Sequence, residues 1–141
     1  MSKLKLLFGL FVVALLFGFS SKSNAQSEPV MYFCEKYDDV TGEIDVSDRF
    51  YPGYLTVMVK SANALGLSDV SIQFDKYDCR TGTFSFYKKF NYSVSPDMKY
   101  IYFSRNAESD MSFDDPGIYR VFLLNSSNRT VASALVEIIP R

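Results

Sequence analysis

The side chains that most often carry out chemistry are sparse in this 141-residue chain. It contains no histidine, the commonest general base and a common metal ligand. A serine, threonine or cysteine nucleophile needs an adjacent base, and no S-x-x-K or G-x-S-x-G motif provides one. Glycine-rich phosphate-binding loops are missing as well. We therefore expect a protein that is not an enzyme, with no catalytic residue and no bound metal or cofactor.

Acidic side chains are the one exception, because calcium sites and glycosidases both depend on carboxylates. They crowd the segments 38–48 and 110–115. In the first segment, Val40 and Gly42 stand where a calcium loop of the form D-x-[DN]-x-[DN]-G would place ligands. We interpret both segments as solvated loops whose charge discourages edge-to-edge strand pairing. Calcium binding by the Asp38–Asp48 loop stays open as an alternative.

The first 25 residues predict a cleaved secretory signal peptide rather than part of the fold. Lys3 and Lys5 form a positive start, residues 6–19 are largely apolar, and Ser23 and Ala25 suit the −3 and −1 positions of a cleavage site. As a helix, residues 6–19 span about 21 Å, less than the roughly 30 Å of a membrane core. We expect cleavage after Ala25, a secreted or periplasmic location, and no membrane span in the remaining chain.

The remaining chain is mildly acidic. It has 12 basic and 16 acidic side chains, a net charge of −4, and so gives no electrostatic reason to bind nucleic acid or anionic membranes. N-x-[ST] triplets occur at Asn91, Asn125 and Asn128, and they would be glycosylated only in a eukaryotic secretory pathway. Cys34 and Cys79 both remain after signal removal. An even pair in an oxidising compartment predicts a structural disulfide between them.

The elements that hold these residues are predicted to be short β-strands. Apolar and polar side chains alternate with period 2 in segments that turn-forming Gly, Pro, Asn and Asp residues separate. These segments are 30–37, 54–60, 70–75, 83–92, 99–104, 117–125 and 130–139. Only residues 61–67 suit a helical turn. Many short antiparallel strands predict a single all-β domain over residues 26–141, either a sandwich or a barrel.

Two local patterns need an explanation of their own. The alternation that contains Phe84 and Phe86 would carry Lys88 inward, which favours a β-bulge at Lys88-Lys89 over a junction of two strands. The segments 36–42 and 76–82 share the pattern K-Y-D-x-x-T-G. Because the match extends little further, turn chemistry explains it better than an internal duplication, with Asp starting the turn and Gly providing positive φ.

The stretch Asp115-Pro116-Gly117-Ile118-Tyr119 resembles the D-x-G-x-Y corner of immunoglobulin domains. The resemblance implies an immunoglobulin-like antiparallel β-sandwich of about seven strands. It also implies that Tyr119 is a buried structural corner whose hydroxyl bonds to nearby backbone. Val121 stands where the family has its second bridge cysteine, and the chain contains no tryptophan. The family's disulfide is therefore not carried over to Cys34 and Cys79.

Aromatic side chains are the most suggestive candidates for binding. Strand parity places four tyrosines opposite the apolar residues Leu55, Phe86, Ile101 and Phe103, and therefore on an outer face: Tyr54, Tyr87, Tyr100 and Tyr102. Tyrosine is rigid, amphipathic and enriched at interfaces. The first hypothesis is a non-enzymatic module that binds a protein or a cell-envelope component at this face. The alternative is a carbohydrate-binding module that uses the same tyrosines, although stacking platforms usually favour the larger ring of tryptophan.

Overall fold

The computed structural model describes residues 28–141, which form eleven strands and no helix. The predicted signal peptide and its cleavage after Ala25 lie outside the described residues. The strands are β1 (Val30–Asp38), β2 (Gly42–Ser47), β3 (Arg49–Phe50), β4 (Gly53–Tyr54), β5 (Thr56–Lys60), β6 (Asp69–Asp78), β7 (Thr83–Ser93), β8 (Tyr100–Phe103), β9 (Ser112–Phe113), β10 (Gly117–Asn125) and β11 (Thr130–Ile138). No helix in this part of the chain is long and apolar enough to cross a membrane.

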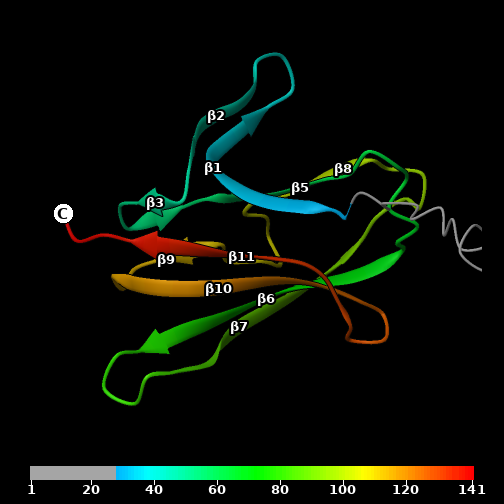
Figure 1. Cartoon of the computed structure of the whole chain (residues 1–141). Helices are drawn as coiled ribbons and strands as arrows, with labels where there is room; N and C mark the ends of the chain where they lie inside the picture. The colour runs from blue at the N-terminus through cyan, green and yellow to red at the C-terminus, as the bar shows by residue number, and fades with distance from the viewer. Residues whose placement is uncertain (1–27) are drawn as a thin grey trace, which may run out of the picture.

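Two main sheets face each other (Figure 1). The first sheet has the order β2-β1-β5-β8, the second has the order β3-β11-β10-β6-β7, and β4 and β9 form a small separate pair. All strand pairs are antiparallel except β3 with β11. The long strands can be given the letters of immunoglobulin domains in chain order. The first sheet is then A-B-E (β1, β5, β8), and the second is G-F-C-C′ (β11, β10, β6, β7). The chain is therefore an immunoglobulin-like β-sandwich, as predicted, and not a barrel.

The core lies between the two sheets and follows from strand alternation. Val57 and Val59 of β5 are completely buried, as are Tyr119, Val121 and Leu123 of β10. On each strand these residues are two apart, so their side chains share one face. Rings of the second sheet and of β9 then pack edge to face, with the centroids of Phe74 and Phe113 5.3 Å apart. The seven predicted strand segments all contain strands. The predicted helical turn at 61–67 is wrong, and most of the predicted acidic loop at 38–48 is strand β2.

That segment is held by the loop between β7 and β8 instead of by helical hydrogen bonds. The Leu65 nitrogen donates to the Met98 carbonyl (2.8 Å), and the Gly66 nitrogen donates to the Pro96 carbonyl (2.9 Å). Gly66 has a φ of 66°, a left-handed conformation in which residues with a Cβ are strained. A residue in this conformation does not continue a right-handed helical turn.

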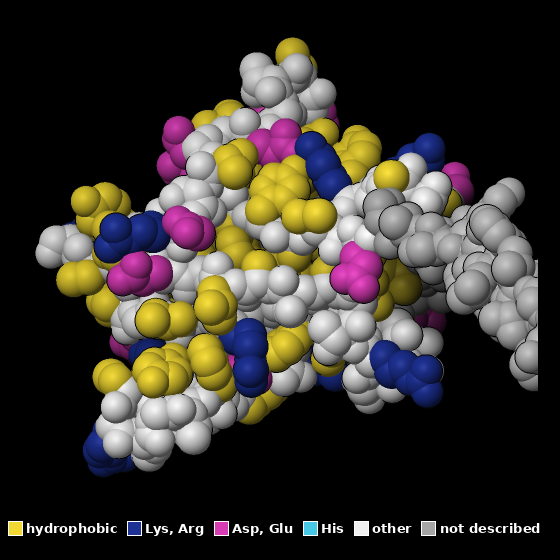
Figure 2. Space-filling view, viewed as in Figure 1, with side chains coloured by type: hydrophobic (Ala, Val, Ile, Leu, Met, Phe, Trp, Pro, Cys, Tyr) yellow, Lys and Arg dark blue, Asp and Glu magenta, His cyan; other side chains and the backbone are white. Residues whose placement is uncertain are grey.

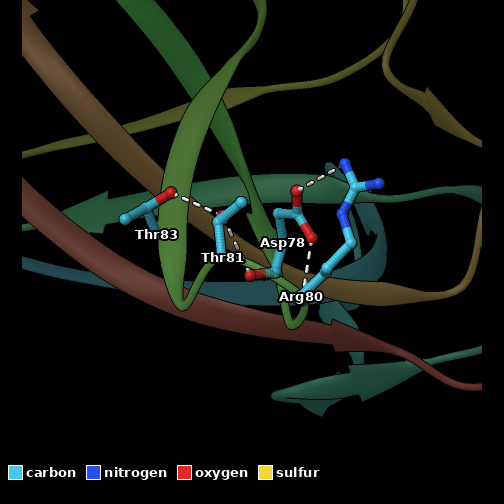
Figure 3. Close-up of polar contacts among 4 residues, drawn as sticks. All are labelled: Asp78, Arg80, Thr81 and Thr83. Carbon is cyan, nitrogen blue, oxygen red and sulfur yellow. Dashed lines mark hydrogen bonds and ion pairs between the residues drawn. The ribbon is translucent and has the colours of Figure 1, made fainter.

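Both K-Y-D-x-x-T-G segments form hairpin turns, as turn chemistry predicts. In the β1–β2 hairpin, Asp38 Oδ1 accepts the backbone N–H groups of Val40 and Thr41, each at 2.9 Å. Asp78 Oδ1 accepts the Arg80 N–H at 2.9 Å in the β6–β7 hairpin, where Asp78 also pairs with the Arg80 guanidinium (Figure 3). The glycine that ends each pattern has a φ of 78° or 72°. The shared sequence thus specifies the same kind of turn at two hairpin tips.

The predicted bulge is present in β7, one residue earlier than expected. Phe86 pairs with Asp75 and Lys88 pairs with Phe74, so Tyr87 is the extra residue on β7. The bulge was expected to keep Lys88 from pointing inward, but Lys88 does turn inward beyond it. Its ammonium donates to the Asp110 carbonyl at 2.9 Å and to the Ser112 carbonyl. Burial lowers the pKa of the Lys88 ammonium. This lysine ties the middle of β7 to the segment that leads into β9.

The corner predicted from the immunoglobulin resemblance is confirmed. Tyr119 is completely buried, and its hydroxyl donates to the Asp115 carbonyl at 2.8 Å. Burial raises the pKa of this phenol well above its usual range. Because a buried hydroxyl needs a partner, the hydrogen bond fixes the chain where it enters β10.

The predicted disulfide between Cys34 and Cys79 is wrong, and both thiols are free. Cys34 lies in β1 of the first sheet and is buried, and burial raises the pKa of its thiol. Cys79 is exposed at the tip of the β6–β7 hairpin, which belongs to the second sheet. A disulfide needs Cα atoms within about 7 Å of each other, which an even cysteine count does not ensure.

Candidate binding surface

The tyrosines of β8 point outward as the alternation predicts. Ile101 and Phe103 are buried in the core, whereas Tyr100 is 50% exposed and Tyr102 is 40% exposed. Both tyrosines therefore stand on the outer face of the first sheet. Tyr102 is paired with Met58 of β5, and Met58 in turn is paired with Tyr32 of β1. Directly opposed residues share a face, so Tyr32 and Tyr102 flank Met58 on the outer face. Met58 is therefore completely buried, although it points away from the core.

A third tyrosine joins them from a distant part of the sequence. β1 pairs with β5 from Val30 to Cys34 and with β2 from Phe33 to Asp38. The hairpin of β1 and β2 projects from the sandwich (Figure 1), and near its end Tyr37 stacks on Tyr102 with ring centroids 4.3 Å apart. The rings of Tyr37 and Tyr100 are 6.4 Å apart. The phenol of Tyr100 raises the pKa of Tyr37 to about 12. We call Tyr37, Tyr100 and Tyr102 the tyrosine cluster.

Polar contacts hold the hairpin in this position. Tyr32 donates its phenolic hydrogen to Glu43 Oε1 at 2.6 Å, and the Lys60 ammonium pairs with the same oxygen. The Lys60 ammonium also lies 5.6 Å from the centre of the Tyr32 ring. Hydrogen bonds from Lys60 and Tyr32 lower the pKa of Glu43 to about 2, and the Glu43 carboxylate raises the pKa of Lys60. β1, β2 and β5 are thereby joined on the same outer face that carries the tyrosine cluster.

The tyrosine cluster adjoins an unpaired strand edge. β8 is the last strand of the first sheet within the described residues. At the end of its ladder the Ser61 nitrogen donates to the Lys99 carbonyl at 2.8 Å. Hydrogen-bonded and non-bonded pairs alternate along an antiparallel ladder, so the backbone groups of Ile101 and Phe103 point toward β5. Those of Tyr100 and Tyr102 therefore point toward the free edge.

A groove of about 340 Å³ lies beside this edge. Its lining comes from the end of β7, the following loop and β8, and consists of Tyr92, Ser93, Val94, Met98, Lys99, Tyr100, Ile101, Tyr102 and Phe103. Most of these side chains are apolar or aromatic, and the ring of Tyr92 packs 4.8 Å from that of Phe103. The site thus combines free backbone groups, an apolar groove and exposed phenols.

The predicted face of four tyrosines does not exist as such. Tyr87 is half buried and packs against the core, with its ring 5.3 Å from that of Tyr119. It turns inward because the bulge leaves Phe86, expected to be buried, on the outside. Tyr54 is exposed as predicted, but it lies on β4, where Arg105 stacks 4.4 Å above its ring. Only Tyr100 and Tyr102 come together.

The sequence reasoning missed Tyr37 as a site residue. Its position in the K-Y-D-x-x-T-G pattern indicates a turn, and nothing local shows that the hairpin reaches β8. The acidic segments show no coordination geometry, since the described residues contain no group of three or more side chains that could hold a metal ion. Asp38 instead uses its carboxylate in the turn, where hydrogen bonds from Thr41 and Val40 lower its pKa.

Comparison with known proteins gives only distant likenesses. No protein-family model matches the chain, and no curated protein matches it by sequence. Among solved structures, the chain is similar to an immunoglobulin-like protein from Pseudomonas aeruginosa, with a TM-score of 0.49 and 9% identity over 82% of this chain and 99% of the other. It is also similar to superoxide reductase (neelaredoxin) from Ignicoccus hospitalis, with a TM-score of 0.39 and 10% identity over 81% of this chain and 80% of the other. These likenesses concern the arrangement of strands and carry nothing about activity.

Proposed function

We propose that this chain is a non-enzymatic binding module of the cell envelope or extracellular space that captures a protein partner at β8. The observation that carries the proposal is the tyrosine cluster beside the free edge of β8. A partner segment in extended conformation would pair with the backbone groups of Tyr100 and Tyr102 as an added strand. Its side chains would alternate between the tyrosine cluster and the adjacent groove.

The energetics of such a contact favour these residues as anchors. Tyrosines near the centre of an interface often cost about 2 kcal/mol or more when truncated, because they combine a rigid ring with a polar tip. Tyr37 and Tyr102 already stack on each other, so little conformational entropy is lost when a partner covers them. The secreted or periplasmic location that residues 1–25 predict belongs to this proposal.

A capture experiment with matched variants tests the proposal. The protein, purified from cells that express the full chain, is immobilised and exposed to envelope extract, and bound proteins are quantified by mass spectrometry. The double variant Tyr100→Ser, Tyr102→Ser should lose at least one protein that the unaltered chain retains. The double variant Tyr51→Ser, Tyr54→Ser changes two exposed tyrosines outside the tyrosine cluster and should retain it.

Two outcomes would point elsewhere. Identical protein sets for both double variants would show that β8 is not the binding surface. A glycan array distinguishes the carbohydrate-binding alternative from the protein-binding proposal. The alternative predicts that a glycan binds and that its binding requires Tyr100 and Tyr102. The stacking of Tyr37 on Tyr102 covers ring faces that a sugar would use, which favours the protein partner.

A further inference from the structure

The outer face of the second sheet carries a large apolar area that the tyrosine cluster does not explain. A row of paired residues crosses its four long strands: Leu135 on β11, Arg120 on β10, Asp75 on β6 and Phe86 on β7. Both ends of this row are apolar and open to solvent, since Phe86 is 65% exposed and Leu135 is 56% exposed. Figure 2 shows hydrophobic side chains on both sides of a basic one over these strands.

Stacking and polar contacts hold the two central residues of the row, Arg120 and Asp75. The Arg120 guanidinium lies 4.4 Å from the centre of the Phe84 ring and 4.8 Å from that of Phe122, and it pairs with Asp75 at 3.3 Å. Gln73 donates to the other Asp75 oxygen at 2.9 Å. An arginine fixed between aromatic rings and surrounded by exposed apolar side chains is the composition of an interface centre. We name this surface, made of Phe84, Phe86, Ile118, Arg120, Phe122 and Leu135, the aromatic face.

The charges of the aromatic face are nearly balanced, which favours a second copy of the chain as its partner. Lys89, which is paired with Gln73 on the same outer face and bonds to Asn128, adds one positive charge. Arg120 is paired with Asp75, and Arg49 is paired with Glu137 at 2.7 Å at the edge of the same sheet. The chain after residue 25 has a net charge of −4, so two copies repel each other over most of their surfaces. Between two copies of the aromatic face this repulsion is much smaller, because Arg120 and Arg49 are both paired with acids and only Lys89 adds charge.

We propose that the aromatic face is the dimer interface between two copies of this chain. With a two-fold axis between Arg120 and Asp75, Leu135 of one copy meets Phe86 of the other, so the row is complementary to itself. The four strands are about 4.8 Å apart and about nine residues long, so the whole outer face of the sheet, with the aromatic face in it, covers about 600 Å². This approaches the roughly 800 Å² that each partner contributes to a standard interface.

Sedimentation equilibrium of the full-length chain tests this inference. At about 100 μM the unaltered protein should have about twice the mass of one chain, since a total of about 1,200 Å² lies at the lower end of the range for specific, stable interfaces. Phe86→Lys places two like charges in the interface and should weaken dimerisation by about 30-fold or more. Val46→Lys is the matched control, because Val46 is equally exposed but belongs to the first sheet, and it should leave the dimer intact.

Two results would contradict the proposal that the aromatic face is a dimer interface. A protein that stays monomeric at about 100 μM overturns the proposal, even if the aromatic face is then found to bind a different protein. A dimer that Phe86→Lys does not weaken has its interface elsewhere. The Tyr100→Ser, Tyr102→Ser variant should dimerise normally, so failure of the dimer and failure of the binding function at β8 are separate outcomes.

Discussion

Tyr37 stacks on Tyr102 with ring centroids 4.3 Å apart and ring planes at 23°. The contact joins the tip region of the β1–β2 hairpin to the edge strand β8, although β5 lies between β1 and β8 in the first sheet. It depends on the hairpin projecting on the outer side of the first sheet, where Glu43 contacts both Tyr32 and Lys60. The position of the hairpin and the shape of the candidate binding surface are therefore coupled.

Because Glu43 holds the hairpin in place, the thermal stability of the protein should depend on pH. The pKa of Glu43 falls from 4.5 to about 2 on folding, so its ionised form stabilises the fold fully above about pH 5 and loses this effect as the pH drops toward 2. Thermal midpoints of the unaltered protein and of Glu43→Gln should therefore differ at pH 6 and converge by about pH 2. A difference that is the same at both pH values would show that the carboxylate has no such role.

Removal of the Tyr119 hydroxyl should weaken the corner. In Tyr119→Phe the ring stays in the core, but the Asp115 carbonyl loses its donor. We expect the free energy of unfolding to fall by about 0.5–1.5 kcal/mol, measured by urea denaturation. Ile118→Val, on the outer face of the same strand, should change it much less. An unchanged midpoint in Tyr119→Phe would contradict the corner.

Lys88 should protect the segment that follows β8. In Lys88→Met the ammonium no longer bonds to the carbonyls of Asp110 and Ser112. Loss of about 1 kcal/mol of local stability would raise the population of open conformers about fivefold, and trypsin should then cleave after Arg105 correspondingly faster. Lys89→Met is the control, because Lys89 points outward and bonds to Asn128 instead. Equal cleavage rates in both variants would show that Lys88 does not anchor this segment.

The two thiols should differ in reactivity. Cys79 is exposed, whereas Cys34 is buried and has a raised thiol pKa. Alkylation of the native protein followed by intact mass should thus add one label rapidly and a second only after denaturation. Rapid labelling of both cysteines would contradict the burial of Cys34, and no labelling before reduction would show a disulfide.

Period-2 alternation predicted most of the fold because the burial of a strand's side chains follows directly from their parity. It placed Tyr100 and Tyr102 outside, and the D-x-G-x-Y pattern identified the corner at Tyr119. It failed at Tyr87, where a single extra residue in β7 exchanges the two faces of the strand. Parity cannot fix such a position, since the chain on either side of a bulge alternates equally well.

Contacts between distant segments were beyond prediction for a different reason. Whether Tyr37 meets Tyr102, or Cys34 meets Cys79, depends on how hairpins bend and on which sheet each strand joins. Neither quantity is encoded in the local pattern. The aromatic face was hidden in the same way, because Phe84 and Phe86 resemble core residues until the pairing of β6 with β7 is known.

Residue-resolved hydrogen exchange of the protein, alone and bound to the partner captured at β8, tests the central claim most directly. In the free protein the amides of Tyr100 and Tyr102 should exchange fast, because they point to the free edge, while those of Ile101 and Phe103 exchange slowly. Partner binding should slow exchange at Tyr100 and Tyr102. Unchanged exchange at these two amides, with new protection elsewhere, would contradict binding along β8.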